Sequence, residues 1–210
     1  MSEGLRFLAL FGIGLSTGLS GAMIPGPLML YTVSEAFRTG RWAGVKIALG
    51  HLVLEAGFVT LVVFGCRQLL WSVAFRTMVA WVGGVGLVVM GGLILARLRS
   101  LSVVSEATLP CVWGPWVGGA VFSLASPGFV LWWATIGTAV FLQAALAGCA
   151  GVAAMATGHA TADLVWGWLV AFSVERGRAY CTHRLYRWVM AAIAVTLFGL
   201  GCGLPIYHWL

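Results

Sequence analysis

A histidine stands four residues before an acid twice in this chain, and a glycine precedes each histidine. The pairs are His51 with Glu55 and, about half a chain length later, His159 with Asp163. Residues four apart share one face of a helix, so each histidine should stack over its acid. Ionisable side chains in a lipid-buried stretch are costly, and a matched pair of them is therefore a functional-site hypothesis by default.

A break rich in proline and glycine precedes each pair. The two breaks consist of Pro25, Gly26 and Pro27 and of Ser126, Pro127 and Gly128. After each break a new half-helix should begin, and its free N–H groups and dipole attract an anion such as a carboxylate. A cavity between the breaks and the acids would offer positive helix ends to a carboxylate and acids to an ammonium group or a proton. Such a cavity suits a zwitterion.

The composition is that of a polytopic membrane protein. Hydrophobic residues make up 61% of the chain and charged residues 9%, against about 25% charged in a typical soluble domain. The formal charge is +6, but the basic residues stand at helix ends without a basic stripe, so we expect the lipid bilayer and no nucleic acid as partner. The His-x3-acid spacing differs from that of metalloproteases, and the chain has no nucleophile elbow or P-loop. We expect no enzymatic activity and no cofactor.

The apolar stretches predict an all-α fold with six transmembrane helices. They cover about 5–37, 44–66, 77–96, 114–143, 147–172 and 186–206. The first and fourth are too long for a straight helix across about 30 Å of hydrocarbon, so we expect breaks at 25–27 and 126–128. Arg6 and the apolar run after it imitate a signal peptide. We interpret this run as a retained first helix, because the second half contains its counterpart.

The distribution of basic residues predicts the topology. Nine of the twelve lysines and arginines follow the first, third and fifth spans: Arg38, Arg41, Lys46, Arg97, Arg99, Arg176, Arg178, Arg184 and Arg187. That side should be cytoplasmic, which places both termini outside, in the cell (inner) membrane of a prokaryote. Three helices per repeat then invert the second repeat (114–210) relative to the first (1–96), with a cytoplasmic linker at 97–113 between them.

The depth of the ionisable residues can be estimated from the flanking charges. At about 1.5 Å per residue, Glu55 and Asp163 lie near the midplane when counted from Lys46 and Glu175. His51 and His159 should then lie on opposite sides of the midplane, more than about 10 Å apart in depth. We expect both acids to face the interior of the bundle.

Several of these residues and their spacing resemble those of the LysE-type amino-acid exporter family. The resemblance rests on the first break, the glycines after it, and the second break with its following helix: Gly40, Gly44, Gly50, Leu131, Trp132, Trp133, Ala134, Thr135 and Gly137. The paired Gly-His-x3-acid motifs resemble an uncharacterised branch of that family from archaea and bacteria. Two departures are the Ser126-Pro127 dipeptide, where the family usually carries Asn-Pro, and His51, where many members have Asp.

The resemblance implies proton-coupled export of an amino acid or a derivative through a six-helix inverted-repeat fold. The substrate-binding or coupling residues would be those of the two breaks together with His51, Glu55, His159 and Asp163. A divalent-cation exporter with the two histidines and two acids as ligands is the alternative, because imidazole and carboxylate suit first-row metals. A membrane scaffold and an electron-transfer enzyme are further alternatives. The cargo, the role of the histidines and the formation of a homo-oligomer stay open at this level.

Overall fold

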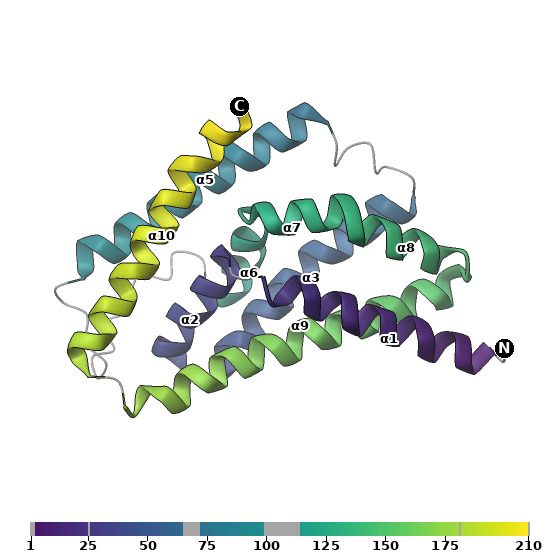
Figure 1. The fold of residues 1–210 in the computed structure, drawn as a ribbon, viewed down its shortest axis with the longest axis horizontal. Coiled ribbons are helices and arrows are strands. Elements are labelled where there is room, and N and C mark those ends of the chain that lie inside the picture. The colour runs from purple at the N-terminus through teal and green to yellow at the C-terminus, as the bar shows by residue number, and fades with distance from the viewer. Residues whose placement is uncertain (1–2, 25, 65–71, 99–113, 181, 210) are drawn as a thin grey trace.

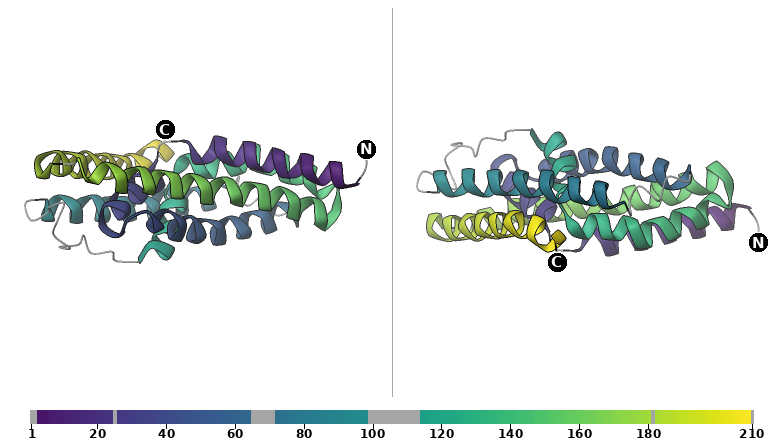
Figure 2. Two further views of the ribbon diagram at one scale, coloured as in Figure 1. Left: turned by 90° about the horizontal axis from the view of Figure 1, so that it is seen from below. Right: turned by 90° about the horizontal axis from the view of Figure 1, so that it is seen from above.

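A computed structural model describes residues 3–24, 26–64, 72–98, 114–180 and 182–209. Within these ranges the regular elements are helices and there is no strand, as the composition predicts. The helices form an elongated, flattened bundle (Figures 1 and 2). The expected linker at 97–113 lies almost entirely outside the described residues, and so does Pro25.

The first predicted span is two helices, as expected. Helix α1 (Glu3–Ala22) ends before the break, and α2 (Pro27–Thr39) begins at its second proline. Proline is well suited to the first position of a helix, because its fixed φ matches the helix and its missing N–H has no partner there in any case. Gly40 ends α2 at φ 80°, a conformation that a side chain would strain.

The fourth span is also broken, and it contains an element that the sequence did not predict. Helix α6 (Gly114–Leu124) ends before Ser126, and α7 (Pro127–Trp132) begins at the proline. A π-helical turn, η1 (Trp133–Gly137), then leads into α8 (Thr138–Ala145). Such single π turns occur frequently at functional sites.

The remaining helices are long and pair with partners far away in the sequence. They are α3 (Trp42–Val63), α5 (Val73–Arg97), α9 (Gly148–Arg178) and α10 (His183–Trp209). Helix α1 runs along α9, α6 packs on α3, and α3 also contacts α9. Helices α5 and α10 pair with each other at one side of the bundle (Figure 1).

Two helix crossings repeat the same glycine pattern. A Cβ on Gly14 of α1 would meet the backbone of Met155 in α9, and a Cβ on Gly119 of α6 would meet the backbone of Ile47 in α3. In these pairs Gly119 corresponds to Gly14, and Met155 to Ile47, with nearly the offset that relates the two Gly-His motifs. Each half therefore packs its first helix on the middle helix of the other half.

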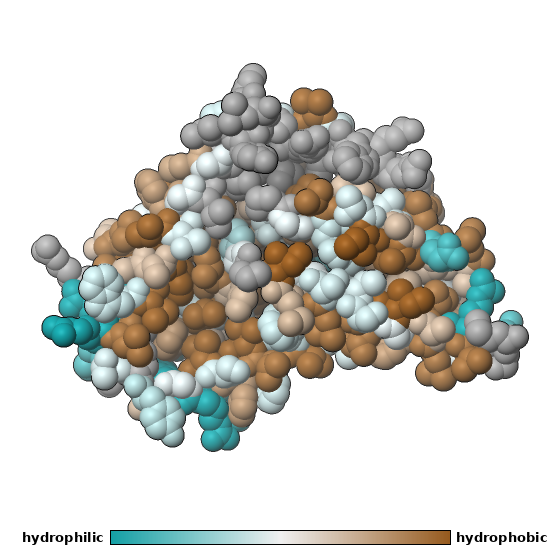
Figure 3. Space-filling model, viewed as in Figure 1, coloured by the Kyte–Doolittle hydropathy of each residue, from teal (hydrophilic) through white to brown (hydrophobic). Residues whose placement is uncertain are grey.

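The surface is that of a membrane protein. Among the described residues, four helical stretches are long and apolar enough to cross a bilayer: Glu3–Ala22, Trp42–Val63, Gly128–Ala145 and His183–Gly203. Hydrophobic side chains cover most of the face in Figure 3, and hydrophilic ones gather at its two ends. Each of the six predicted spans overlaps one or more helices, but within the described residues only these four stretches are long and apolar enough to cross a bilayer.

Candidate functional site

The two His-acid pairs meet inside the bundle. Helix α3 carries His51 and Glu55 one turn apart, and α9 carries His159 and Asp163 in the same way. All four side chains are buried, with 5–8% of each residue exposed. The acids therefore face the interior, as the cost of a charge in lipid predicts. We call these four residues the quartet.

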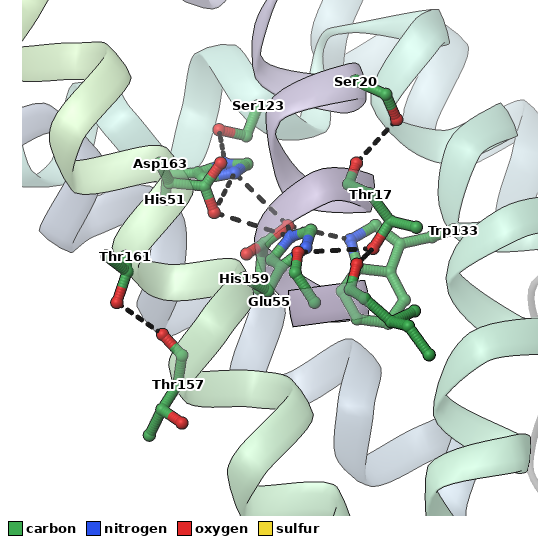
Figure 4. A network of polar contacts seen from close by, with 12 residues as sticks. Thr17, Ser20, His51, Glu55, Ser123, Trp133, Thr157, His159, Thr161 and Asp163 are labelled. Carbon is green, nitrogen blue, oxygen red and sulfur yellow. Dashed lines mark hydrogen bonds and ion pairs between the residues drawn. The ribbon is translucent and has the colours of Figure 1, made fainter. Parts of the chain in front are cut away.

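The quartet is a closed ring in which each imidazole lies between two carboxylates (Figure 4). His51 Nε2 is 3.3 Å from Glu55 Oε1 and 3.9 Å from Asp163 Oδ2. His159 Nε2 is 3.1 Å from Glu55 Oε1 and 3.5 Å from Asp163 Oδ2. When all four groups are ionised, the two positive and two negative charges cancel, which is how charge is best tolerated at a buried site.

The predicted separation of the histidines in depth is wrong. Both Nε2 atoms lie within 3.3 Å of the same carboxylate oxygen. The depth estimate assumed that Lys46 and Glu175 lie at the same level of the membrane. Glu175 instead accepts a hydrogen bond from the backbone N–H of Arg41 at 2.9 Å, so it does not lie level with Lys46. Lys46 is five residues further along α3, which corresponds to about 7 Å of helix. The lengths of the two histidine side chains account for the remaining difference in depth.

A hydrogen-bond chain fixes the ring of His51. The hydroxyl of Ser123 donates to the carbonyl of Gly119, and its oxygen lies 2.7 Å from His51 Nδ1. Because a hydroxyl has one proton to donate, His51 Nδ1 is the donor to Ser123. In a neutral ring, Nε2 then carries a lone pair that faces two carboxylates. This nitrogen requires a proton or another cation between it and the acids.

The other histidine lacks this support. His159 Nδ1 has no hydrogen-bond partner within the described part of the chain. The position on α1 that corresponds to Ser123 is Gly18, and a Cβ there would lie 2.9 Å from His159 Nδ1. The two halves thus differ in how firmly they hold their histidine.

The glycines before the histidines let neighbouring helices approach. A Cβ on Gly50 would meet the backbone of Trp116 in α6, and a Cβ on Gly158 would meet the backbone of Phe11 in α1. Small residues at such crossings allow close backbone contact in membranes. The motif therefore holds α3 and α9 against the first helices of the opposite halves, which places the quartet at the centre.

A cavity of about 100 Å³ lies beside the quartet. Asp163 and both histidines line it, whereas Glu55 is not among its lining residues. Both breaks reach it: Gly26, Ser126 and Gly128 line it, while Pro27 and Pro127 begin the half-helices that follow. The cavity thus joins the two features that the sequence singled out.

Several lining or bonding residues were not predicted as part of the site. Trp133 donates its indole N–H to Glu55 Oε1 at 3.1 Å, and Ser123 holds His51. Thr32, Phe129 and Trp166 line the cavity. The sequence shows that Ser123 occupies in the second half the position that Gly18 occupies in the first. Its role in holding His51, however, depends on which helices pack together.

A family model of the LysE type translocators matches residues 19–208 of the chain. The chain belongs to this family. No curated protein and no solved structure matches it significantly. The expected LysE-type membership is therefore confirmed, and with it a multi-pass membrane transporter of the exporter type.

The family match covers both breaks, the quartet and every cavity-lining residue except Gly18. Within the described residues, the helices of this LysE-type translocator place the quartet beside a cavity that both breaks line. Family membership identifies the class of protein. The geometry of the breaks, the quartet and the cavity bears on the cargo and on the coupling to protons.

Proposed function

We propose that this LysE-type translocator exports a small amino acid or an amino-acid derivative by alternating access, driven by the proton gradient. The observation that carries the proposal is the cavity that both helix breaks, Asp163 and the two histidines share. Its volume of about 100 Å³ is well below the roughly 300–1,000 Å³ of pockets for drug-sized ligands. A small cargo fits this space best.

The first turn of α2 supplies the site for the carboxylate of the cargo. Gly26, Leu28 and Met29 line the cavity at the start of this helix. The first N–H groups of a helix have no acceptor within it, and the helix dipole adds positive potential at this end. Asp163 on the facing helix α9 offers a negative partner for the ammonium group. Together they match a zwitterion.

The quartet supplies the proton site. Each of its two imidazoles lies within 3.9 Å of both carboxylates, so a proton taken up at one group changes the charge felt by the other three. Because Asp163 and the two histidines of the quartet also line the cavity, cargo and proton compete for one negative centre. Such competition is the basis of an exchange of inward-moving protons for outward-moving cargo.

The packing of the two halves favours an inverted-repeat transporter. The reciprocal glycine crossings fit two three-helix repeats at 1–96 and 114–210 with a linker at 97–113. The cavity lies towards the end of the bundle where α2 ends and α3 begins, which is the end rich in arginine. By the positive-inside rule this end is cytoplasmic, in a prokaryotic inner membrane with both termini outside.

Flux measurements in proteoliposomes test the proposal. An imposed pH gradient should drive efflux of one or more small amino acids, and Glu55→Gln and Asp163→Asn should abolish this flux. Glu175→Gln, at an exposed acid that does not line the cavity, is the matched control and should keep it. Amino-acid flux that does not depend on the pH gradient, or that persists in both amide variants, contradicts the proposal.

Export of a divalent cation is the second candidate, and one observation favours it. Ligand atoms of His51, Glu55 and Asp163 all lie within 4.8 Å of one another, and His159 Nε2 faces the same two carboxylates. Imidazole and carboxylate together suit first-row metals. The bond from His51 Nδ1 to Ser123 resembles the outer hydrogen bond that orients metal-ligating histidines. The same liposomes, loaded with Mn²⁺, Co²⁺ or Zn²⁺ in place of amino acids, distinguish the two cargoes.

A further inference from the structure

Trp132 carries a buried hydrogen-bond donor without an acceptor. The residue ends α7 and is 7% exposed, and its indole Nε1 has no hydrogen-bond partner within the described part of the chain. An indole nitrogen can only donate, and a donor that is buried without an acceptor is unfavourable. Trp132 lines the cavity beside the quartet. The missing acceptor therefore points to a group that enters this cavity.

Other unpartnered groups gather at the same cavity. Six buried side-chain nitrogen or oxygen atoms lack a hydrogen-bond partner among the described residues. Four of them belong to residues that line the cavity: Trp132 Nε1, His159 Nδ1, Asp163 Oδ2 and Trp166 Nε1. Buried polar groups in proteins are nearly always paired. Their concentration around one cavity indicates that a polar ligand completes the site.

The first turn of α2 offers further donors to this cavity. The residue before the helix is Gly26, which has no side chain that could accept from the first N–H groups. The N–H groups of Leu28 and Met29 also have no acceptor within the helix. All three residues line the cavity, and the positive end of the helix dipole adds to their attraction for an anion.

Counting along the helices places Trp132 on the side to which these N–H groups point. Helices α2 and α9 both line the cavity, and both run towards a common contact, where a Cβ on Gly40 would lie 3.5 Å from the carboxyl group of Glu175. Thirteen residues back from this contact, α2 starts at Pro27 and α9 is three residues short of His159. The ring of His159 lies 4.9 Å from that of Trp132. Trp132 is therefore about one turn beyond the start of α2, and an anion between them can accept from both.

The last turn of α1 covers the indole nitrogen. A Cβ on Gly21 would lie 3.3 Å from Trp132 Nε1, so this glycine lets α1 pack against the indole. Gly21 lines the cavity as well, and α1 ends at the next residue, where the first break begins. A small shift of this turn at the break exposes the nitrogen to the cavity.

We propose that Trp132 binds the carboxylate of the cargo, with its indole N–H on one oxygen and the first turn of α2 on the other. This inference rests on the proposed function and adds the side chain that recognises one end of the amino acid. The ammonium group then lies at Asp163, four residues after His159 on α9. Trp132 also distinguishes the two candidate cargoes, since an N–H donor cannot be a ligand of a divalent cation.

Equilibrium binding in detergent micelles, measured by calorimetry without any gradient, tests this role. The probes are glycine, L-alanine and L-serine, each compared with the amine that lacks only the carboxylate: methylamine, ethylamine and ethanolamine. Trp132→Phe keeps an aromatic ring and loses the N–H. It should weaken binding of the amino acids about tenfold or more, because a hydrogen bond to a charged group is lost. It should leave the affinity for the amines unchanged.

The indole N–H gives a second readout in the unaltered protein. In spectra of protein with isotope-labelled tryptophan, the N–H signal of Trp132 is identified by its loss in Trp132→Phe. An amino acid that binds should move this signal downfield in the parent protein, because the N–H then donates to a carboxylate. The corresponding amine should not move it. Neither should shift the signal of Trp168, which stacks on Phe172 and does not line the cavity.

The matched control for affinity is Trp168→Phe, which should bind every probe like the parent protein. Equal effects of the two tryptophan variants, or equal losses for amino acids and amines in Trp132→Phe, would overturn the carboxylate site. A Trp132 signal that no bound amino acid moves would also overturn it, and would leave water as the occupant beside the indole.

Failure of this inference is distinguishable from failure of amino-acid export. Binding that depends on Trp132 without pH-driven flux would support the carboxylate site and refute proton-driven export. Propionate, which lacks the ammonium group, should bind more weakly than L-alanine; equal affinity would keep the carboxylate site and refute the zwitterion. Absence of binding by all three amino acids would refute the amino-acid cargo itself, and this inference with it.

Discussion

Neutralising the two acids of the quartet should have unequal effects on stability. Glu55 Oε1 accepts hydrogen bonds from Trp133 and His159, both at 3.1 Å, and lies 3.3 Å from His51. Asp163 Oδ2 lies 3.5 and 3.9 Å from the imidazoles and makes no hydrogen bond within the described residues. Glu55→Gln therefore weakens two charge-assisted bonds, and Asp163→Asn weakens none.

The difference can be estimated from these contacts. A hydrogen bond to a charged group contributes roughly 1.5–3 kcal/mol, so Glu55→Gln should cost about 3 kcal/mol or more of unfolding free energy. Asp163→Asn should cost about 1 kcal/mol, because neutralisation also relieves the desolvation of a weakly paired carboxylate. For a chain of about 200 residues, 1 kcal/mol corresponds to about 2–4 °C in Tm. The two variants should then differ by roughly 5 °C.

Thermal unfolding in detergent micelles, followed by circular dichroism at the helical band, measures the difference. The exposed-acid variant Glu175→Gln should unfold close to the parent protein, because surface ion pairs contribute little. If Asp163→Asn lowers Tm as much as Glu55→Gln, or more, the assignment of Glu55 as the hub of the ring is wrong. Both variants should still lose pH-driven flux, since neither amide titrates.

Other substitutions test the crossings and the hydrogen-bond chain. Gly50→Ala should cost about 1–3 kcal/mol or more by overpacking, because its Cβ meets the backbone of α6. Gly57→Ala in the same helix has open space and should be neutral or slightly stabilising in the same melts. Ser123→Ala should cost about 1 kcal/mol and shift the pH dependence of flux, because His51 loses the bond that fixes its ring. Thr157→Ala removes an exposed hydroxyl bond and should leave that pH dependence unchanged.

Much of this protein follows from the sequence alone. The scarcity of charge in a chain that is 61% hydrophobic indicates a helical membrane protein. Lipid offers no hydrogen-bond partners, so the backbone polar groups of each spanning segment must pair within that segment, as they do in a helix. The prolines after Ile24 and after Ser126 determine where the first and fourth spans break, since proline removes a helical donor. Spacing by four residues determines that each histidine stands over its acid.

The tertiary structure decided how the two motifs meet. The sequence places His51 beside Glu55 and His159 beside Asp163, yet each imidazole also reaches the acid of the other helix. Counting along each helix could not predict this, because it needs the relative depth of two helices, which the Arg41–Glu175 contact shows.

The π turn and the bond from Trp133 to Glu55 also depended on packing. The residues from Trp133 to Gly137 have no local pattern that distinguishes a π turn from an α-helix. The turn forms where the hydroxyl of Thr138 reaches a carbonyl five residues earlier and both tryptophan rings fold over a glycine. The bond from Trp133 to Glu55 joins residues 78 positions apart. Only the approach of α3 to the helix after the second break brings them together.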